Sequence, residues 1–146
     1  MWDWVKYCFK HYAVFDGRAG RPEYWWFYLF TFLGNLVLTL PAPRSLVLPG
    51  LFLLVTLIPS LAVTARRMHD TGHSLGWAVA APCLAGTALA AYGHGMTVAA
   101  GVAVKVFALL MVAAAAGLML WVLSVLCRIG NPGPNRYGNP APITPS

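Results

Sequence analysis

Hydrophobic residues along this chain fall into four long runs, separated by short polar segments. The runs cover about residues 24–40, 46–65, 75–92 and 104–127. A helix needs about 17–25 mostly apolar residues to cross the hydrocarbon core of a bilayer, and each run approaches or reaches that length. The pattern therefore predicts an all-α integral membrane protein with four transmembrane helices.

The first residues show a different, amphipathic pattern. Apolar side chains recur there at helical spacing, and the lysines lie off that stripe: Trp2, Val5, Cys8, Phe9 and Tyr12 against Lys6 and Lys10. A short helix of mixed aromatic and basic residues typically lies flat in the headgroup layer of a membrane. We therefore expect an N-terminal interfacial amphipathic helix. The alternative is a short helix packed on the protein's own surface.

The most polar stretch, Ala65 to Ser74, lies between the second and third runs. It holds two arginines, two histidines and an aspartate. A single charged residue at mid-membrane costs about 2.5–3.5 kcal/mol on insertion scales, so we expect a tight turn at a membrane surface here. Pro59 precedes this stretch and removes a backbone donor, which is expected to kink or loosen the helix.

Other turns follow from glycine and proline. A stiff turn is predicted at residues 41–45 and a flexible one at Gly93-His94-Gly95. Glycine, proline and asparagine dominate residues 128–140, so we expect an irregular C-terminal tail there, with residues 141–146 flexible. We find no internal repeat and expect a single membrane domain over residues 1–140.

Composition indicates that the bilayer is part of this chain's solvent. Of the 146 residues, 59% are hydrophobic and only 10% are charged, whereas soluble domains carry about 25% charged residues. In a soluble protein, the net charge of +6 would indicate nucleic-acid binding. Here the basic residues flank apolar runs, which favours anionic lipid as a partner and no nucleic acid. The three cysteines lack zinc spacing, so no metal or cofactor is expected.

Lysine and arginine are distributed unequally between the two predicted faces. One face has Arg44 and Lys105, and the other collects all the rest: Lys6, Lys10, Arg18, Arg21, Arg66, Arg67, Arg128 and Arg136. The positive-inside rule places the richer face in the cytoplasm. The sequence thus predicts a multi-pass protein with both termini cytoplasmic.

Three segments carry motifs that resemble one family. They are Gly17-Arg18-Ala19-x-Arg21-x-Glu23 with the aromatic run 24–27, then Pro59 with residues 65–72, and finally residues 133–138, Gly-Pro-Asn-Arg-Tyr-Gly. In this order they are similar to the small bacterial inner-membrane family of YhaH/YhaI-type proteins, the domain of unknown function numbered 805. The resemblance spans about residues 4–140. It implies an inner-membrane location, several spans and a shared polar cluster, but no particular activity.

We expect the three motifs to meet at the cytoplasmic face. One interpretation is structural, because charges at this depth need partners: Glu23 and Asp70 neutralise arginines, and Asn135 and Tyr137 cap loop backbone groups. The other is functional, because arginine recognises phosphate through its planar fork and the arginines outnumber the acids. The residues in this ligand-binding hypothesis are Arg18, Arg21, Arg66, Arg67, His69 and Arg136.

Enzymatic interpretations depend on the histidines. The segment from His69 to His73 resembles the H-E-x-x-H zinc motif, but that motif needs a continuous helix and a glutamate, so a metalloprotease is disfavoured. His69 beside Asp70 is a chemically sensible acid/base pair for a bound phosphate. We predict a non-enzymatic membrane module that binds anionic lipid or a partner membrane protein, a second copy included. The alternative is an enzyme or transporter acting on a phosphorylated lipid or other anionic substrate.

Overall fold

A computed structural model describes residues 1–40, 47–97 and 101–141, without the side chains of residues 94–97. The described residues form five α-helices and divide into two compact units. Unit 1 comprises Met1–His73 with Ile129–Ser146, and unit 2 comprises Ser74–Arg128. The predicted all-α class is confirmed, whereas the single domain over residues 1–140 stays a prediction. The predicted turn at 41–45 and the predicted flexible tail after Ala141 lie outside the described residues.

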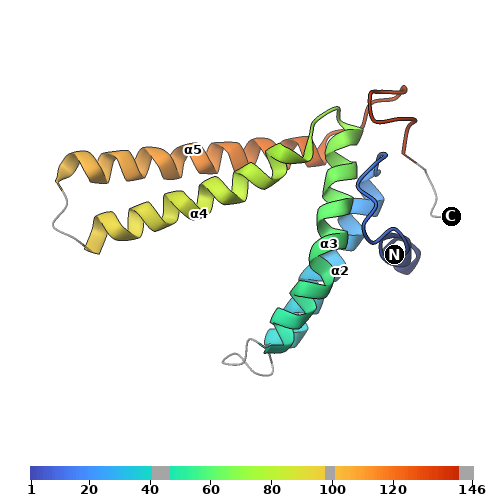
Figure 1. Cartoon of the computed structure of the whole chain (residues 1–146), viewed down its shortest axis with the longest axis horizontal. Helices are drawn as coiled ribbons and strands as arrows, with labels where there is room; N and C mark the ends of the chain where they lie inside the picture. Colours follow the sequence, from blue (N-terminus) through green and yellow to red (C-terminus); the bar gives the residue numbers. More distant parts are fainter. Residues whose placement is uncertain (41–46, 98–100, 142–146) are drawn as a thin grey trace. The chain divides into compact units, whose positions relative to one another are not determined.

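Helices α2 (Arg21–Thr39) and α3 (Val47–Asp70) lie side by side as an antiparallel pair in unit 1 (Figure 1). α2 has Pro22 in its first turn, where the missing N–H has no helical partner in any case. The two helices approach closely at Gly34, because a Cβ there would lie 2.5 Å from the Phe52 ring. The hairpin places the start of α2 next to the end of α3, where the polar motifs lie.

Helix α1 (Trp2–Lys10) packs on α2 and also contacts α3. Val5 and Cys8, on its apolar stripe, are only 3% and 0% exposed, and Phe9 meets Phe27 edge to face at a centroid distance of 5.6 Å. This arrangement corresponds to the alternative of a helix packed on the protein's own surface. The lysines of α1 are exposed, and its placement in the membrane interface stays a prediction.

Pro59 does not interrupt α3. A proline lacks the N–H that would bond the carbonyl four residues earlier, which here belongs to Val55. The Tyr12 hydroxyl supplies the missing donor and bonds the Val55 carbonyl oxygen over 2.7 Å. The expected loosening is therefore compensated by a side chain from the loop after α1.

The polar stretch is mostly helical, so the turn predicted over Ala65–Ser74 is corrected. α3 continues to Asp70 because its charged side chains are buried against partners, as described below. Gly72 then ends the helical run with a positive φ of 78°, a conformation that glycine adopts without strain. Its N–H donates back to the His69 carbonyl over 3.0 Å.

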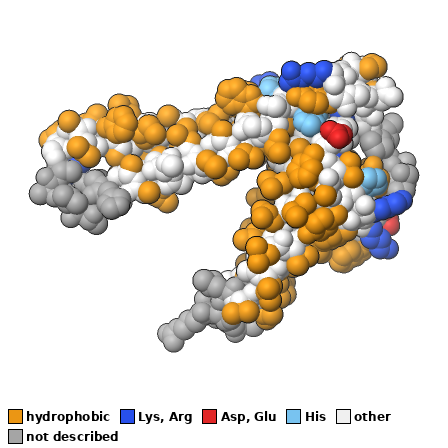
Figure 2. Space-filling view, in the orientation of Figure 1, with side chains coloured by type: hydrophobic (Ala, Val, Ile, Leu, Met, Phe, Trp, Pro, Cys, Tyr) orange, Lys and Arg blue, Asp and Glu red, His pale blue; other side chains and the backbone are white. Residues whose placement is uncertain are grey.

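Unit 2 is a hairpin of α4 (Leu75–Thr97) and α5 (Val102–Cys127), which pack along each other (Figure 1). Ala88 and Ala115 are nearly fully buried, and small residues of this kind let helices approach closely. On the face that Figure 2 shows, hydrophobic side chains are spread along this hairpin. The turn predicted at Gly93–Gly95 is wrong: α4 continues to Thr97, because a glycine lowers helix propensity by only about 1 kcal/mol.

Within the described residues, three helices are long and apolar enough to cross a membrane: Val47–Asp70, Leu75–Gly93 and Val102–Cys127. α2 is not among them, so the four predicted spans are reduced to three on this criterion. Its tyrosines, tryptophans, Glu23 and Asn35 lower its hydropathy. Residues 129–141 form the expected irregular segment, with one isolated bridge between Asn135 and Gly138.

Candidate functional site

Three distant segments meet at the end of α3. The backbone N–H of Ala19, in the loop before α2, donates to the Arg66 carbonyl over 2.9 Å. The backbone N–H of Asn131, in the loop after α5, donates to the Asp70 carbonyl over 2.9 Å. All of these residues belong to unit 1. The structure thus brings together the three segments that carry the polar motifs.

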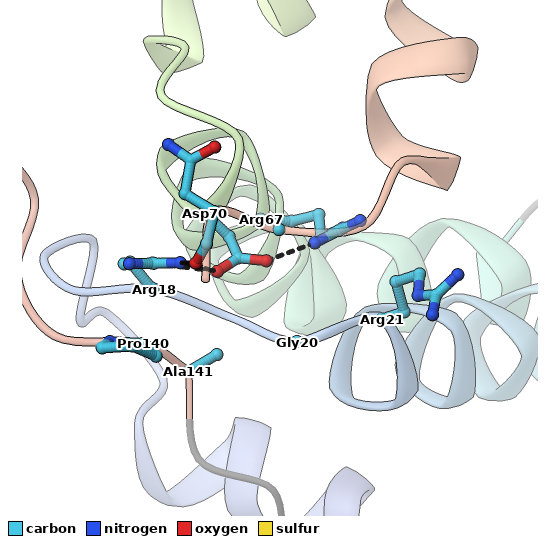
Figure 3. Close-up of a pocket in the computed structure, with 9 residues that line it drawn as sticks. Arg18, Gly20, Arg21, Arg67, Asp70, Pro140 and Ala141 are labelled. Atoms are coloured by element: carbon cyan, nitrogen blue, oxygen red, sulfur yellow. Dashed lines mark hydrogen bonds and ion pairs between the residues drawn. The ribbon is translucent and has the colours of Figure 1, made fainter. Parts of the chain in front are cut away.

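Asp70 joins two arginines through different oxygens. Its Oδ1 lies 2.9 Å from Nε and 2.8 Å from Nη2 of Arg18, and its Oδ2 lies 2.5 Å from Nη1 of Arg67. All three side chains are buried. Figure 3 shows both guanidinium groups directed at the one carboxylate. Buried charges need such partners, because removing one leaves an uncompensated charge in a poorly polarisable environment.

Arg18 also holds the C-terminal loop in place. Its guanidinium donates to the carbonyl oxygens of Asn131 and Gly133, the latter over 2.7 Å, and to that of Gly138 over 3.5 Å. The same loop passes so close to Asp70 that a Cβ at Gly130 would overlap the carboxyl group. Arg18 therefore links the N-terminal loop, α3 and the C-terminal loop.

Glu23 and Arg66 form a second, deeper ion pair. Glu23 Oε1 lies 2.6 Å from Arg66 Nη1, and the two side chains are 0% and 4% exposed. The pair is end-on, so Glu23 Oε2 and Arg66 Nε and Nη2 are buried without a hydrogen-bond partner. The Cys8 thiol lies 4.0 Å from Glu23 Oε1. Burial raises the pKa of the Glu23 carboxyl to about 7, although the Arg66 guanidinium opposes this effect.

His69 and Tyr137 form a stacked pair beside these clusters. Their rings lie 3.8 Å apart and within 6° of parallel. The Asn135 side-chain amide donates to the His69 carbonyl oxygen over 2.9 Å, and its Oδ1 accepts the backbone N–H of Tyr137 over 2.8 Å. The Asn135 side chain thus bonds one backbone group through its amide nitrogen and another through its amide oxygen. The Tyr137 ring stacks on His69, a contact that the sequence analysis did not anticipate.

A polar pocket of about 190 Å³ opens beside Asp70 in unit 1. Its walls come from the loop before α2, the end of α3 and the C-terminal loop: Arg18, Gly20, Arg21, Arg67, Asp70, Gly130, Asn131, Pro140 and Ala141. Arg21 is exposed, and Figure 3 shows no interaction between it and the other residues drawn. The pocket therefore combines an inner wall, where two arginines share one carboxylate, with an exposed cation at its edge.

Comparison with known proteins assigns the chain to a family. Residues 12–139 match the family described as "Protein of unknown function (DUF805)". The chain belongs to this family. The family predicted from the three motifs is thereby confirmed, and the match covers all three polar motifs, from Arg18 to Tyr137.

Curated relatives place the family in a membrane. The DUF805 chain is 40% identical over 80 residues to inner membrane protein YhaI of Escherichia coli K12, covering 52% of this chain and 68% of YhaI. It is 35% identical over 85 residues to inner membrane protein YhaH, covering 53% and 70%. It is also 42% identical over 67 residues to YiiR, covering 44% and 46%. No solved structure matches the chain.

The structure separates the residues of the ligand-binding hypothesis into groups. Arg18, Arg21 and Arg67 line the pocket. Arg66 lies apart from it with Glu23, and His69 stacks on Tyr137. Arg136 is exposed and donates to the Gly72 carbonyl oxygen over 3.1 Å. The sequence analysis missed further contributors, which are Cys8, Gly20, Gly130 and Asn131.

The structure also bears on the zinc motif. α3 ends at Asp70, between His69 and His73, so the two histidines do not share one helix face as the motif requires. Among the described residues, no group of three metal-binding side chains is close enough to hold an ion.

Proposed function

We propose that this DUF805 protein is a non-enzymatic inner-membrane module that binds a phosphate-bearing lipid headgroup in the pocket beside Asp70. The observation that carries the proposal is the position of Arg21, an exposed cation at the edge of a polar pocket. The pocket walls carry three arginines against one aspartate, so a net positive charge faces the occupant.

The backbone at the pocket favours an anion as well. Gly20 is the N-cap of α2 and has no side-chain cap, and it lines the pocket together with Arg21. The first N–H groups of a helix lack helical partners and lie at the positive end of the helix dipole. A phosphate at a helix N-terminus beside an arginine uses both features.

The outer face of α2 favours a lipid over a soluble anion. Positions 21, 25, 28 and 32 follow helical spacing and therefore share one face. Trp25 is partly exposed, and Tyr28 and Phe32 are 53% and 56% exposed. Aromatic side chains of this kind gather where a helix enters a membrane. A phosphate at Arg21 would thus have an apolar, aromatic surface for its acyl chain directly below it.

We further propose four spans, with α2 crossing from about Tyr24, and both termini in the cytoplasm. Arg18 lies before α2, Asp70 ends α3, and the two are in contact. Two points that meet on one side of a membrane are separated by an even number of crossings, so a crossing by α3 requires one by α2. The contact of Arg18 with Gly133 extends this argument to the C-terminal loop. The excess of lysine and arginine supports a cytoplasmic orientation.

Titration of purified protein with fluorescent phosphatidylglycerol tests the headgroup site, with phosphatidylcholine as the neutral comparison. Arg21→Gln should weaken phosphatidylglycerol binding about fivefold, because one arginine near an anionic surface contributes about 1 kcal/mol. Arg136→Gln is the matched control, since Arg136 is also an exposed arginine in unit 1 but does not line the pocket. Equal losses in the two variants would contradict the proposal.

A competition arm identifies the source of the phosphate. Glycerol 3-phosphate carries the same anion without the acyl chains. If the aromatic face of α2 contributes, this soluble phosphate should compete at least tenfold less well than the lipid. Equal competition would show that the pocket binds soluble phosphates, and the lipid assignment would then be wrong.

A further inference from the structure

A second hollow in unit 1 is entirely different in character. It is a groove of about 470 Å³ beneath the first turn of α1, on the flank of the α2–α3 hairpin. All of its lining residues are apolar or glycine: Met1, Trp2, Leu29, Phe30, Leu33, Gly34, Val37, Leu38 and Phe52.

The groove is distinct from the pocket beside Asp70. The two hollows share no lining residue. The groove lies along positions 29, 33 and 37 of α2, which follow one another at four-residue spacing. The face that begins at Arg21 runs through positions 25, 28 and 32 instead. A ligand in one hollow therefore leaves the other free.

The direction of the groove suits an extended chain. Its α2 wall runs from Leu29 to Leu38, which corresponds to about 13 Å at 1.5 Å per residue. Its α3 wall is Phe52, which lies within the candidate span Val47–Asp70. The groove thus begins near α1 and runs along α2, away from the charged clusters. Its other wall belongs to α3, which is apolar enough to be surrounded by lipid.

Helix α1, whose first residues line the groove, also carries an exposed cation. Lys6 comes four residues after Trp2 on α1, so the two side chains lie on neighbouring positions of the helix surface. Both are exposed, and Trp2 lines the groove. An apolar groove with a lysine one helical turn from a lining residue complements a phospholipid, which joins an acyl chain to an anionic phosphate.

We propose that this groove holds one acyl chain of a phospholipid whose phosphate lies against Lys6. The cation on α1 favours this occupant over an apolar helix of a second copy, which would offer Lys6 no anion. The site lies outside the pocket of the proposed function and does not depend on it.

Native mass spectrometry of protein purified in mild detergent with added phosphatidylglycerol tests the groove. Leu33→Trp and, at its far end, Val37→Trp fill the groove and should each lower the retained lipid at least threefold. Leu36→Trp is the matched control: Leu36 is 43% exposed against 44% for Leu33, but it does not line the groove. Lys6→Gln should lower retention, whereas Lys10→Gln, farther from Trp2, should lower it less.

Each other result has a definite meaning. If both groove-filling variants retain lipid as well as Leu36→Trp does, the groove assignment is wrong. Loss of a retained second copy in place of lipid would assign the groove to a dimer contact and overturn the proposal. Circular dichroism establishes that each variant is folded. Arg21→Gln should leave the lipid in the groove, so failure of the headgroup proposal and failure of this one remain distinguishable.

Discussion

Two buried carboxylates of unit 1, those of Asp70 and Glu23, each bind an arginine of α3, but their surroundings differ. Asp70 uses both of its oxygens, on Arg18 and on Arg67, and its backbone carbonyl accepts a further hydrogen bond from Asn131. Glu23 forms one ion pair, with Arg66, and its second oxygen is buried without a hydrogen-bond partner. One carboxylate thus joins two arginines through both of its oxygens, whereas the other binds one arginine through a single oxygen.

The difference follows from what packs around each group. Asp70 lies beside the C-terminal loop, whose carbonyl oxygens at Asn131 and Gly133 accept the Arg18 donors that the carboxylate leaves over. The backbone N–H of Asn131 in the same loop donates to the Asp70 carbonyl oxygen. Glu23 lies beside the Cys8 thiol of α1, and among the described residues no group donates a hydrogen bond to its Oε2. A buried ion pair without further hydrogen bonds recovers little of its desolvation cost. We infer that Asp70 holds the fold together, whereas Glu23 responds to protons.

The largest predicted effect is the loss of the Asp70 charge. Asp70→Asn leaves two buried guanidinium groups without a counter-ion and should lower the free energy of unfolding by about 3–5 kcal/mol, as expected for a broken buried pair. Glu23→Gln should cost less, about 1–3 kcal/mol near neutral pH, because it leaves one buried guanidinium without a counter-ion where Asp70→Asn leaves two, and because Glu23 is already partly protonated there. Thermal unfolding in detergent measures both. Similar losses of stability in the two variants would contradict the inference that Asp70 stabilises the fold more than Glu23 does.

The second prediction concerns the close approach of the C-terminal loop. A Cβ at Gly130 would overlap the Asp70 carboxyl group, so Gly130→Ala should displace the carboxylate or the loop and cost about 1–3 kcal/mol, the usual range for overpacking. Gly133→Ala is the matched control in the same loop, since a Cβ there meets nothing within 4 Å. The unfolding midpoints should fall for the first variant only. If Gly130→Ala unfolded at the same midpoint as the wild type, the loop at Gly130 would not pack tightly against the Asp70 carboxyl group.

Much of the fold could be predicted because hydrophobic runs determine where membrane helices form. Those runs correctly located α2 to α5 to within a few residues. The end of α3 was misplaced because the charged residues were assigned to a turn at the membrane surface. The pairing of Arg66 and Arg67 with Glu23 and Asp70 lets the helix continue instead. The predicted number of spans exceeded the three candidate spans of the structure because α2 is not among them. Its tyrosines and tryptophans resemble the anchors at membrane interfaces, but they lower the mean hydropathy of the helix.

The candidate site was predictable in its residue types but not in its pairing. Excess arginine beside two acids identified the cluster, yet nothing in the sequence specified that Arg18 and Arg67 would share Asp70. The carbonyl oxygens that bind Arg18 carry no sequence signal, because every residue has one. Gly130 was classed as a turn former, and its role in close packing appears only when Asp70 is placed beside it.

The last prediction is a pH dependence that belongs to Glu23 and not to Asp70. Its pKa is about 7 in the folded protein against an ordinary value of 4.5, and burial is the main cause. The folded state therefore binds this proton more tightly than the unfolded state does. The contribution of Glu23 to stability should consequently be complete below about pH 4.5 and decrease as the pH rises to about 7. The groups that surround Glu23 are Tyr7, Cys8, Arg66 and Asp70.

Unfolding midpoints of the wild type and of Glu23→Gln, measured from pH 5 to pH 8, isolate this contribution. The difference between the two proteins should change steadily up to about pH 7, with the wild type losing stability relative to the variant, and should then level off. Burial raises the pKa of the neighbouring Cys8 thiol to about 12, so this thiol does not titrate in the same range. A difference that is independent of pH would mean that Glu23 stays ionised throughout, and the two carboxylates would then differ only in their number of partners.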